Sequence, residues 1–238
     1  MHFFKFFSIT VVCSMFIFQG FAIAQNTMKQ TLYIIDTDAN DKSSFPSFRM
    51  KAKALFILGE AALFLEQQDT AKKLLEKSVF YFRNRPRHRK LGYDQEDMEL
   101  VNVLGSLSQL YRTSDLPSRA ISSYQHIIFV CESYISTLKR QNPIEQETIK
   151  DATITLAHYQ VELMDLYIQL NRYWPDKDMI NDAVKTFETY KPNTPELAKA
   201  QNVQAQFMVL KSQDDAKKVA KNKKLFEYLN KIKSNAKQ

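Results

Sequence analysis

Apolar residues recur at helical spacing along most of the chain. The clearest row is Leu163, Leu166, Tyr167 and Leu170, which match positions i, i+3, i+4 and i+7 of a helix. This spacing places apolar side chains on one face of an α-helix, where they can pack against another helix. The pattern therefore predicts an all-α protein.

Polar caps and prolines divide the pattern into eight predicted helices, arranged as four antiparallel pairs. Asp69, Asp94 and Thr194 are expected to cap helices, as are Ser114 and Asp115 together. The predicted helices cover, approximately, residues 48–67, 69–82, 94–113, 114–140, 145–173, 178–190, 194–212 and a separate lysine-rich segment after residue 212.

Glycine is scarce, with four residues in the whole chain. Turns of β-hairpins need residues with positive φ, which glycine adopts most readily. Lys, Gln, Leu and Ala fill the intervals, and all four are good helix formers. The composition therefore argues against a hairpin-rich β fold.

Residues 1–24 are typical of a secretory signal peptide. Lys5 precedes an apolar stretch, and Ala22 and Ala24 are small residues at the positions that a signal peptidase recognises. We expect cleavage after Ala24 and export to the periplasm, with secretion as the alternative. An uncleaved anchor is the other interpretation, because residues 6–24 could just span a bilayer. Residues 25–46 then form an N-terminal arm, and residues 47–238 form the helical domain.

The predicted pairs share a further pattern. In the second pair, Leu104, Ser108 and Tyr111 on the first helix are followed by Ala120 and Tyr124 on the second. This arrangement resembles the tetratricopeptide repeat (TPR), in which a small residue marks the place where two helices cross closely. The corresponding small residues of the four pairs are Ala71, Ala120, Ala183 and Ala216. The resemblance implies antiparallel helix pairs stacked as a short TPR-like α-solenoid, although their uneven spacing departs from the family period of about 34 residues. A generic antiparallel helix bundle is the alternative.

First helices of tetratricopeptide repeats line a groove that binds peptides. The resemblance places these residues in the groove: Lys53, Phe56, Glu60, Asn102, Gln109, Arg112, His158 and Asp165. Phe56 and Phe64 would provide an apolar anchor. Some members of the family bind C-terminal carboxylates with a clamp of lysine and asparagine side chains. In the first helix pair of this chain, Phe56 and Glu60 occupy the clamp positions. Binding of a chaperone tail is therefore not implied.

The formal net charge of +7 is mildly basic. It favours contact with anionic surfaces and is too small to suggest a nucleic-acid partner. The positive charge concentrates in two segments, Arg83, Arg85, Arg87, Arg89 and Lys217, Lys218, Lys221, Lys224. An acidic run over residues 94–99 could neutralise the first segment. The second could lie on an anionic membrane, or cap the solenoid with its charges in water.

Patterns for catalysis and metal binding are missing. The histidines beyond the leader lie far apart in sequence, whereas zinc needs four converging ligands, or three and a water molecule. We find no nucleophile elbow and no glycine-rich phosphate loop. Cys131, the one cysteine beyond the leader, is predicted to be buried and unreactive on an apolar helix face. We therefore expect neither an enzyme nor a metal or cofactor site.

These observations predict an exported, non-catalytic scaffold that binds a peptide or protein partner in the cell envelope. The alternative is an envelope-surface binder that lays its basic C-terminal helix on anionic lipid or glycan.

Overall fold

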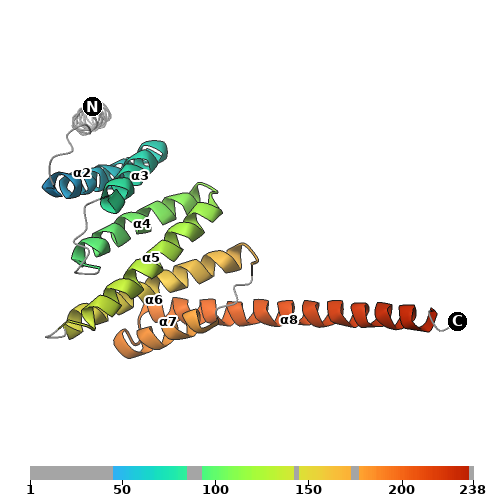
Figure 1. The fold of residues 1–238 in the computed structure, drawn as a ribbon. Coiled ribbons are helices and arrows are strands. Elements are labelled where there is room, and N and C mark those ends of the chain that lie inside the picture. The colour runs from blue at the N-terminus through green and yellow to red at the C-terminus, as the bar shows by residue number, and fades with distance from the viewer. Residues whose placement is uncertain (1–44, 85–92, 142–144, 173–176, 236–238) are drawn as a thin grey trace, which may run out of the picture. The chain divides into compact units, whose positions relative to one another are not determined.

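The computed structural model describes residues 45–84, 93–141, 145–172 and 177–235. These residues form helices and turns without any β-strand, so the predicted all-α class is confirmed (Figure 1). The predicted signal peptide and nearly all of the predicted arm lie outside the described residues. No helix in the described part combines the length and the apolar character needed to cross a membrane.

The helices have the following bounds: α2 Phe45–Phe64, α3 Gln68–Asn84, α4 Gln95–Thr113, α5 Pro117–Leu138, α6 Gln146–Gln169, α7 Lys177–Tyr190 and α8 Pro195–Asn235. The chain divides into two compact units, Met1–Pro86 and Arg87–Gln238. The first contains α2 and α3, and the second contains α4 to α8.

In the first unit, α2 and α3 pack closely against each other. A Cβ atom on Gly59 would lie 2.7 Å from Cδ2 of Leu75, so only glycine allows this approach without a shift. The buried Ser78 hydroxyl donates a 2.7 Å hydrogen bond to the carbonyl oxygen of Ala52 on the other helix. Ala71 is fully buried. Small residues therefore lie where these two helices cross, as the sequence predicted.

In the second unit, each helix packs on the next one in sequence, and α8 also packs on α6. Ala120 and Ala183 are fully buried, so the expected small residues again lie inside. Tyr124, Phe187 and Phe207 are among the largest completely buried side chains. The apolar rows read from the sequence thus form the core that holds α4 to α8 together.

The helix α4 begins at the predicted cap. Oδ1 of Asp94 accepts hydrogen bonds from the backbone N–H groups of Glu96 at 2.8 Å and Asp97 at 3.2 Å. Oδ2 of Asp97 accepts one from the N–H of Asp94 at 2.9 Å, which completes a capping box. Two residues of the acidic run therefore stabilise a helix end.

The helices α2, α4 and α6 end in the same way. Glu66, Asp115 and Asn171 follow them with φ angles of 57°, 54° and 51°. The next residue then donates its N–H to the carbonyl five positions earlier, as from Gln67 to Ala62 at 2.8 Å. This hydrogen bond belongs to a Schellman cap, in which glycine usually adopts the positive φ. The same local turn thus recurs after every second helix.

The predicted cap of α5 is wrong. Helix α5 begins at Pro117 after Leu116, and no side chain caps it. Ser114 instead ends α4, and Asp115 supplies the positive φ of the turn. Proline tolerates the first helical turn because its missing N–H would have no partner there. The turn geometry, more than a polar side chain, therefore sets the start of α5.

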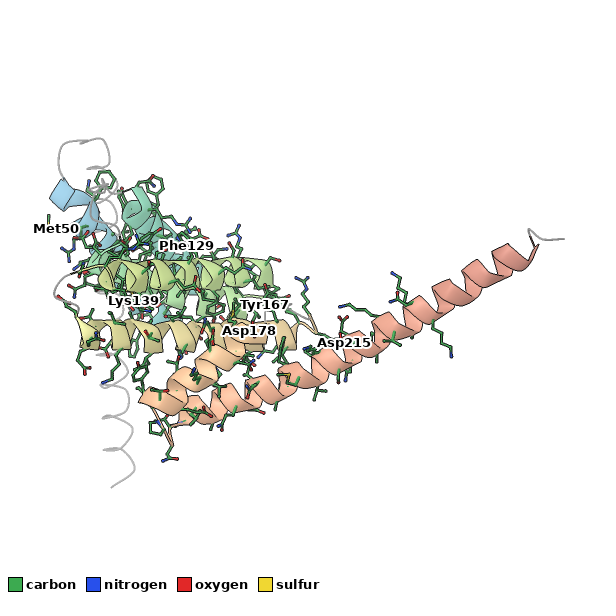
Figure 2. The ribbon with its side chains drawn as sticks, turned by 60° about the horizontal axis from the view of Figure 1, so that its bottom comes forward. Met50, Phe129, Lys139, Tyr167, Asp178 and Asp215 are labelled. Atoms are coloured by element: carbon green, nitrogen blue, oxygen red, sulfur yellow. The ribbon has the colours of Figure 1, made fainter. Side chains whose placement is uncertain are left out.

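The prediction of two separate helices, one over residues 194–212 and one after residue 212, is also wrong. One helix of 41 residues, α8, runs through the expected turn near residue 212. Asp214 and Lys218 form an ion pair of 2.6 Å along it, and this stretch contains no glycine or proline to end the helix. Ala216 and Ala220, expected to pack in the fourth pair, are exposed. Figure 2 shows Asp215 on the part of α8 that extends beyond α6 and α7.

Candidate functional site

A network of charged side chains joins α4, α6 and α8. Arg112 of α4 donates from Nη1 to Glu162 at 3.0 Å and from Nη2 to Asp165 at 2.5 Å. Lys199 of α8 donates to the other oxygen of Glu162, and Gln169 donates to Asp165 at 3.2 Å. Three helices that are not consecutive in sequence therefore meet at one polar cluster, which we call the 112–199 network.

The network is partly shielded from solvent. The side chain of Glu162 is 6% exposed, those of Arg112 and Asp165 are 21% exposed, and that of Lys199 is 44% exposed. Burial alone would lower the pKa of Arg112, but its hydrogen bond and charge interaction with Asp165 raise that pKa above its usual value. The buried carboxylate is thus held between two cations, as a buried charge requires.

Tyr124 lies beneath this network. Burial and the nearby charge of Glu162 raise its pKa to about 12. The hydroxyl oxygen is buried, and interaction with the nearby Arg112 opposes this rise. Tyr124 therefore belongs to the buried side of the network.

A pocket of about 260 Å³ lies one helical turn from the network. It is lined by Ile154, Thr155, His158, Tyr159, Phe187, Lys191 and Glu196. On α6, His158 precedes Glu162 by one turn, and on α8, Glu196 precedes Lys199 in the same way. The pocket and the network therefore lie one turn apart along α6 and α8, and Arg112 of α4 joins the network from the side. We call the pocket and the network together the polar strip.

The charges of the pocket belong partly to the start of α8. The pKa of Glu196 is lowered, first by a hydrogen bond from its own backbone N–H and then by Lys191, Thr194 and His158. Thr194 accepts a 3.4 Å hydrogen bond from the N–H of Leu197 and so caps α8, as predicted. With a volume of about 260 Å³, the pocket has room for one amino-acid side chain and not for a large cofactor.

The structure brings together some of the predicted groove residues. Arg112 and Asp165 form an ion pair, and His158 lines the pocket. Asn102 and Gln109 are exposed two turns apart on α4. Lys53, Phe56 and Glu60 lie on α2 in the other unit, with Glu60 exposed and the other two half-buried.

Sequence reasoning missed Glu162 and Lys199. The available signal for Glu162 was a carboxylate inside an otherwise apolar row, between Val161 and Leu163. Lys199 had no such signal, because its partner lies on a different helix.

The predicted anionic-surface residues are only partly described. Arg83 is exposed near the end of α3, whereas Arg85, Arg87 and Arg89 lie outside the described residues. Lys217, Lys218 and Lys221 are exposed on α8, and Lys224 follows in the same helix.

The site offers charged and polar groups that can form hydrogen bonds and ion pairs. Within the described ranges, no three His, Cys, Asp or Glu residues are grouped so that they could hold a metal ion. Cys131 is buried as predicted, and burial raises its pKa to about 12, so its thiol is unreactive at neutral pH.

The fold and the site define this chain as an all-α protein of packed helical hairpins with a polar strip on alternate helices. Its sequence matches no known family model and no curated protein.

Proposed function

We propose that the chain is an exported, non-catalytic scaffold whose helix pairs stack as a short TPR-like solenoid. In this proposal the strip along α4, α6 and α8 binds an extended segment of a protein partner in the cell envelope. The observation that carries the proposal is the meeting of three alternate helices at the 112–199 network, next to a pocket of side-chain size.

The repeated turns after α2, α4 and α6 support the stacking of helix pairs. In such a stack, the first helices of successive pairs lie side by side. Helix α6 is the first helix of the pair α6 and α7, and α8 begins the next pair. The packing of α8 on α6 is therefore the contact that such a stack requires between first helices. The buried small residues Ala120 and Ala183 support the close crossings within pairs.

The polar strip supports the binding of a peptide in particular. The network fixes the charged side chains, so that they lose little conformational entropy when a ligand arrives. Gln109 and His158 are exposed one helical turn from the network, and Asn102 is exposed two turns before Gln109 on α4. These side chains can hydrogen-bond to a peptide backbone. The half-apolar pocket at Phe187 and Tyr159 can take one side chain of that peptide.

Site-specific photocrosslinking in intact cells tests this function. A photoreactive phenylalanine analogue at Gln109 or His158 should capture a defined partner. Matched controls are Ser122 on α5 and Lys185 on α7, which are exposed on the second helices of the pairs. Capture of the same partner with equal yield at all four positions would show that the strip is not the binding face.

Export is tested separately. The mass of the protein recovered from the periplasm or medium should correspond to a chain that begins at Gln25. Recovery of the protein only in the cytoplasm would remove the envelope from the proposal but leave the peptide-binding strip to be judged by crosslinking.

Binding to an anionic envelope surface is the second candidate. The exposure of Lys217, Lys218 and Lys221 on the extended part of α8 favours it. Sedimentation with phosphatidylglycerol vesicles at low salt should then be lost when Lys217 and Lys221 are changed to glutamate. No sedimentation of the unmodified protein at low salt would exclude this candidate.

A further inference from the structure

The helix α2 is apolar on two opposite sides. One side carries Ala52 and Leu55, which are completely buried. The other side carries Met50, Ile57 and Phe64, whose exposed fractions are 65%, 66% and 87%. A helix that is apolar on both sides is typically covered on both sides. The exposed side of α2 therefore requires an explanation.

The exposed apolar side chains form one row along α2. Met50, Ile57 and Phe64 follow one another at intervals of seven residues, close to two helical turns, and Ala54 and Ala61 fill the gaps. Figure 2 shows Met50 on the side of α2 that faces away from α3. We call these five residues the 50–64 stripe. With a rise of about 1.5 Å per residue, the stripe is about 21 Å long.

The position of the stripe calls for a covering segment. Contiguous exposed apolar surface usually marks a place where another chain segment or molecule binds. In stacked helix pairs, the terminal element needs a polar outer surface. Helix α2 is the first helix that the structure describes, and its outer side is apolar instead.

The sequence directly before α2 contains an apolar run of suitable length. This run, Leu32 to Ile35, lies outside the described residues, and ten residues separate Ile35 from Phe45, where α2 begins. Ten residues span at most about 33 Å. The far end of the stripe, Phe64, lies about 29 Å along the helix from Phe45. The run can therefore reach every part of the stripe when the chain folds back along α2.

The charges on the two segments are complementary in the same order. Between the apolar run and α2 lie three aspartates: Asp36, Asp38 and Asp41. On either side of the stripe, the first half of α2 carries three cations: Arg49, Lys51 and Lys53. Folding back therefore brings the aspartates over the basic half of α2 and the apolar run toward Ile57 and Phe64.

The covalent connection favours this segment over a separate molecule. A short tether gives an effective concentration on the order of 1 mM, which exceeds the concentration of a second copy in a micromolar solution.

We propose that residues 32–44 fold back along α2 and that Leu32 to Ile35 cover the 50–64 stripe. The segment then closes the outer side of the first unit. This contact is independent of the polar strip, which belongs to α4, α6 and α8 of the second unit.

Photocrosslinking within the purified full chain tests the contact. A photoreactive phenylalanine analogue at Phe64 should crosslink to the tryptic peptide of residues 30–42, which trypsin releases by cleavage after Lys29 and Lys42. The matched control is the same analogue at Phe80, an exposed phenylalanine on α3 that is 58% exposed. This control should give little of that product.

Substitutions in the apolar run test its role. The double variant Ile34→Ser, Ile35→Ser should lower the yield of the crosslink from position 64 by at least about tenfold, because two buried isoleucines are lost from the contact. The control Thr31→Ser, Thr37→Ser changes polar positions of the same segment and should keep the yield. Circular dichroism verifies that both variants are folded.

Four results would overturn the proposal. Crosslinking from position 64 to residues 6–29 would assign the stripe to a retained leader, and a crosslinked dimer would assign it to a second copy. Equal yields from positions 64 and 80 would show that the contact is not specific. A yield that the Ile34→Ser, Ile35→Ser variant leaves unchanged would show that the apolar run does not cover the stripe.

Discussion

Removal of Arg112 is expected to be the most damaging single change in the 112–199 network. The Arg112→Ala substitution deletes the guanidinium on α4 that neutralises Glu162 and Asp165 on α6. Glu162 keeps Lys199 as its cation, but that lysine is 44% exposed and is therefore partly screened by solvent. A carboxylate that is 6% exposed then loses its better-shielded partner.

The size of the effect follows from this burial. Removing one member of a buried ion pair costs about 3–5 kcal/mol, because the other charge is left uncompensated. Asp165 is one-fifth exposed and Lys199 remains, so we place the loss at the lower end, about 3 kcal/mol. The free energy of unfolding typically falls by about 2 kcal/mol for each molar increase in urea, so the urea concentration at the unfolding midpoint should fall by about 1.5 M.

Urea unfolding followed by circular dichroism measures this change. Arg140→Ala is the matched control, because Arg140 is an exposed arginine after α5, and its loss should change stability by less than about 0.5 kcal/mol. The double variant Arg112→Leu, Glu162→Leu should cost less than the sum of the single variants, since the most deeply buried carboxylate of the network is removed together with its cation. A loss below about 1 kcal/mol for Arg112→Ala, or strict additivity, would refute the reasoning.

Three further predictions concern single positions. Glu66→Gly should stabilise the protein by about 1 kcal/mol in thermal unfolding, because Glu66 has a φ of 57°, whereas Glu60→Gly inside α2 should destabilise it by a similar amount. Stability should fall as the pH rises from about 9 toward 12. The reason is that Cys131 and Tyr124 have pKa values of about 12 in the folded state and lose their protons at lower pH in the unfolded state. The Tyr124→Phe substitution should reduce this fall. A thiol reagent at pH 8 should label Cys131 in urea but not in buffer; rapid labelling of the folded protein would contradict its burial.

Apolar periodicity predicted the helices well, because each helix must bury one face. The alanines at the crossings, Ala71, Ala120 and Ala183, are buried as expected. The cap at Asp94 could also be predicted, since a capping box involves residues only three positions apart.

Features that depend on distant partners or on backbone geometry were harder to predict. The turns use Glu66, Asp115 and Asn171 at positive φ, so the shortage of glycine did not reveal where helices end. The continuity of α8 was missed because Ala216 matches the small residue at the crossing of a fourth helix pair. An alanine is equally common inside one continuous helix, so it does not indicate a turn before it. Glu162 and Lys199 meet across two helices, and spacing along one chain carries no signal for such a pair.

Contacts between neighbouring helices have a consequence for how the protein folds. Most helix contacts in the second unit link elements that follow each other in sequence, with α6 and α8 as the longer link. Loop closure is then cheap, and such low contact order is associated with fast folding. Each hairpin can form as soon as its own two helices have left the ribosome, before the rest of the chain has been made.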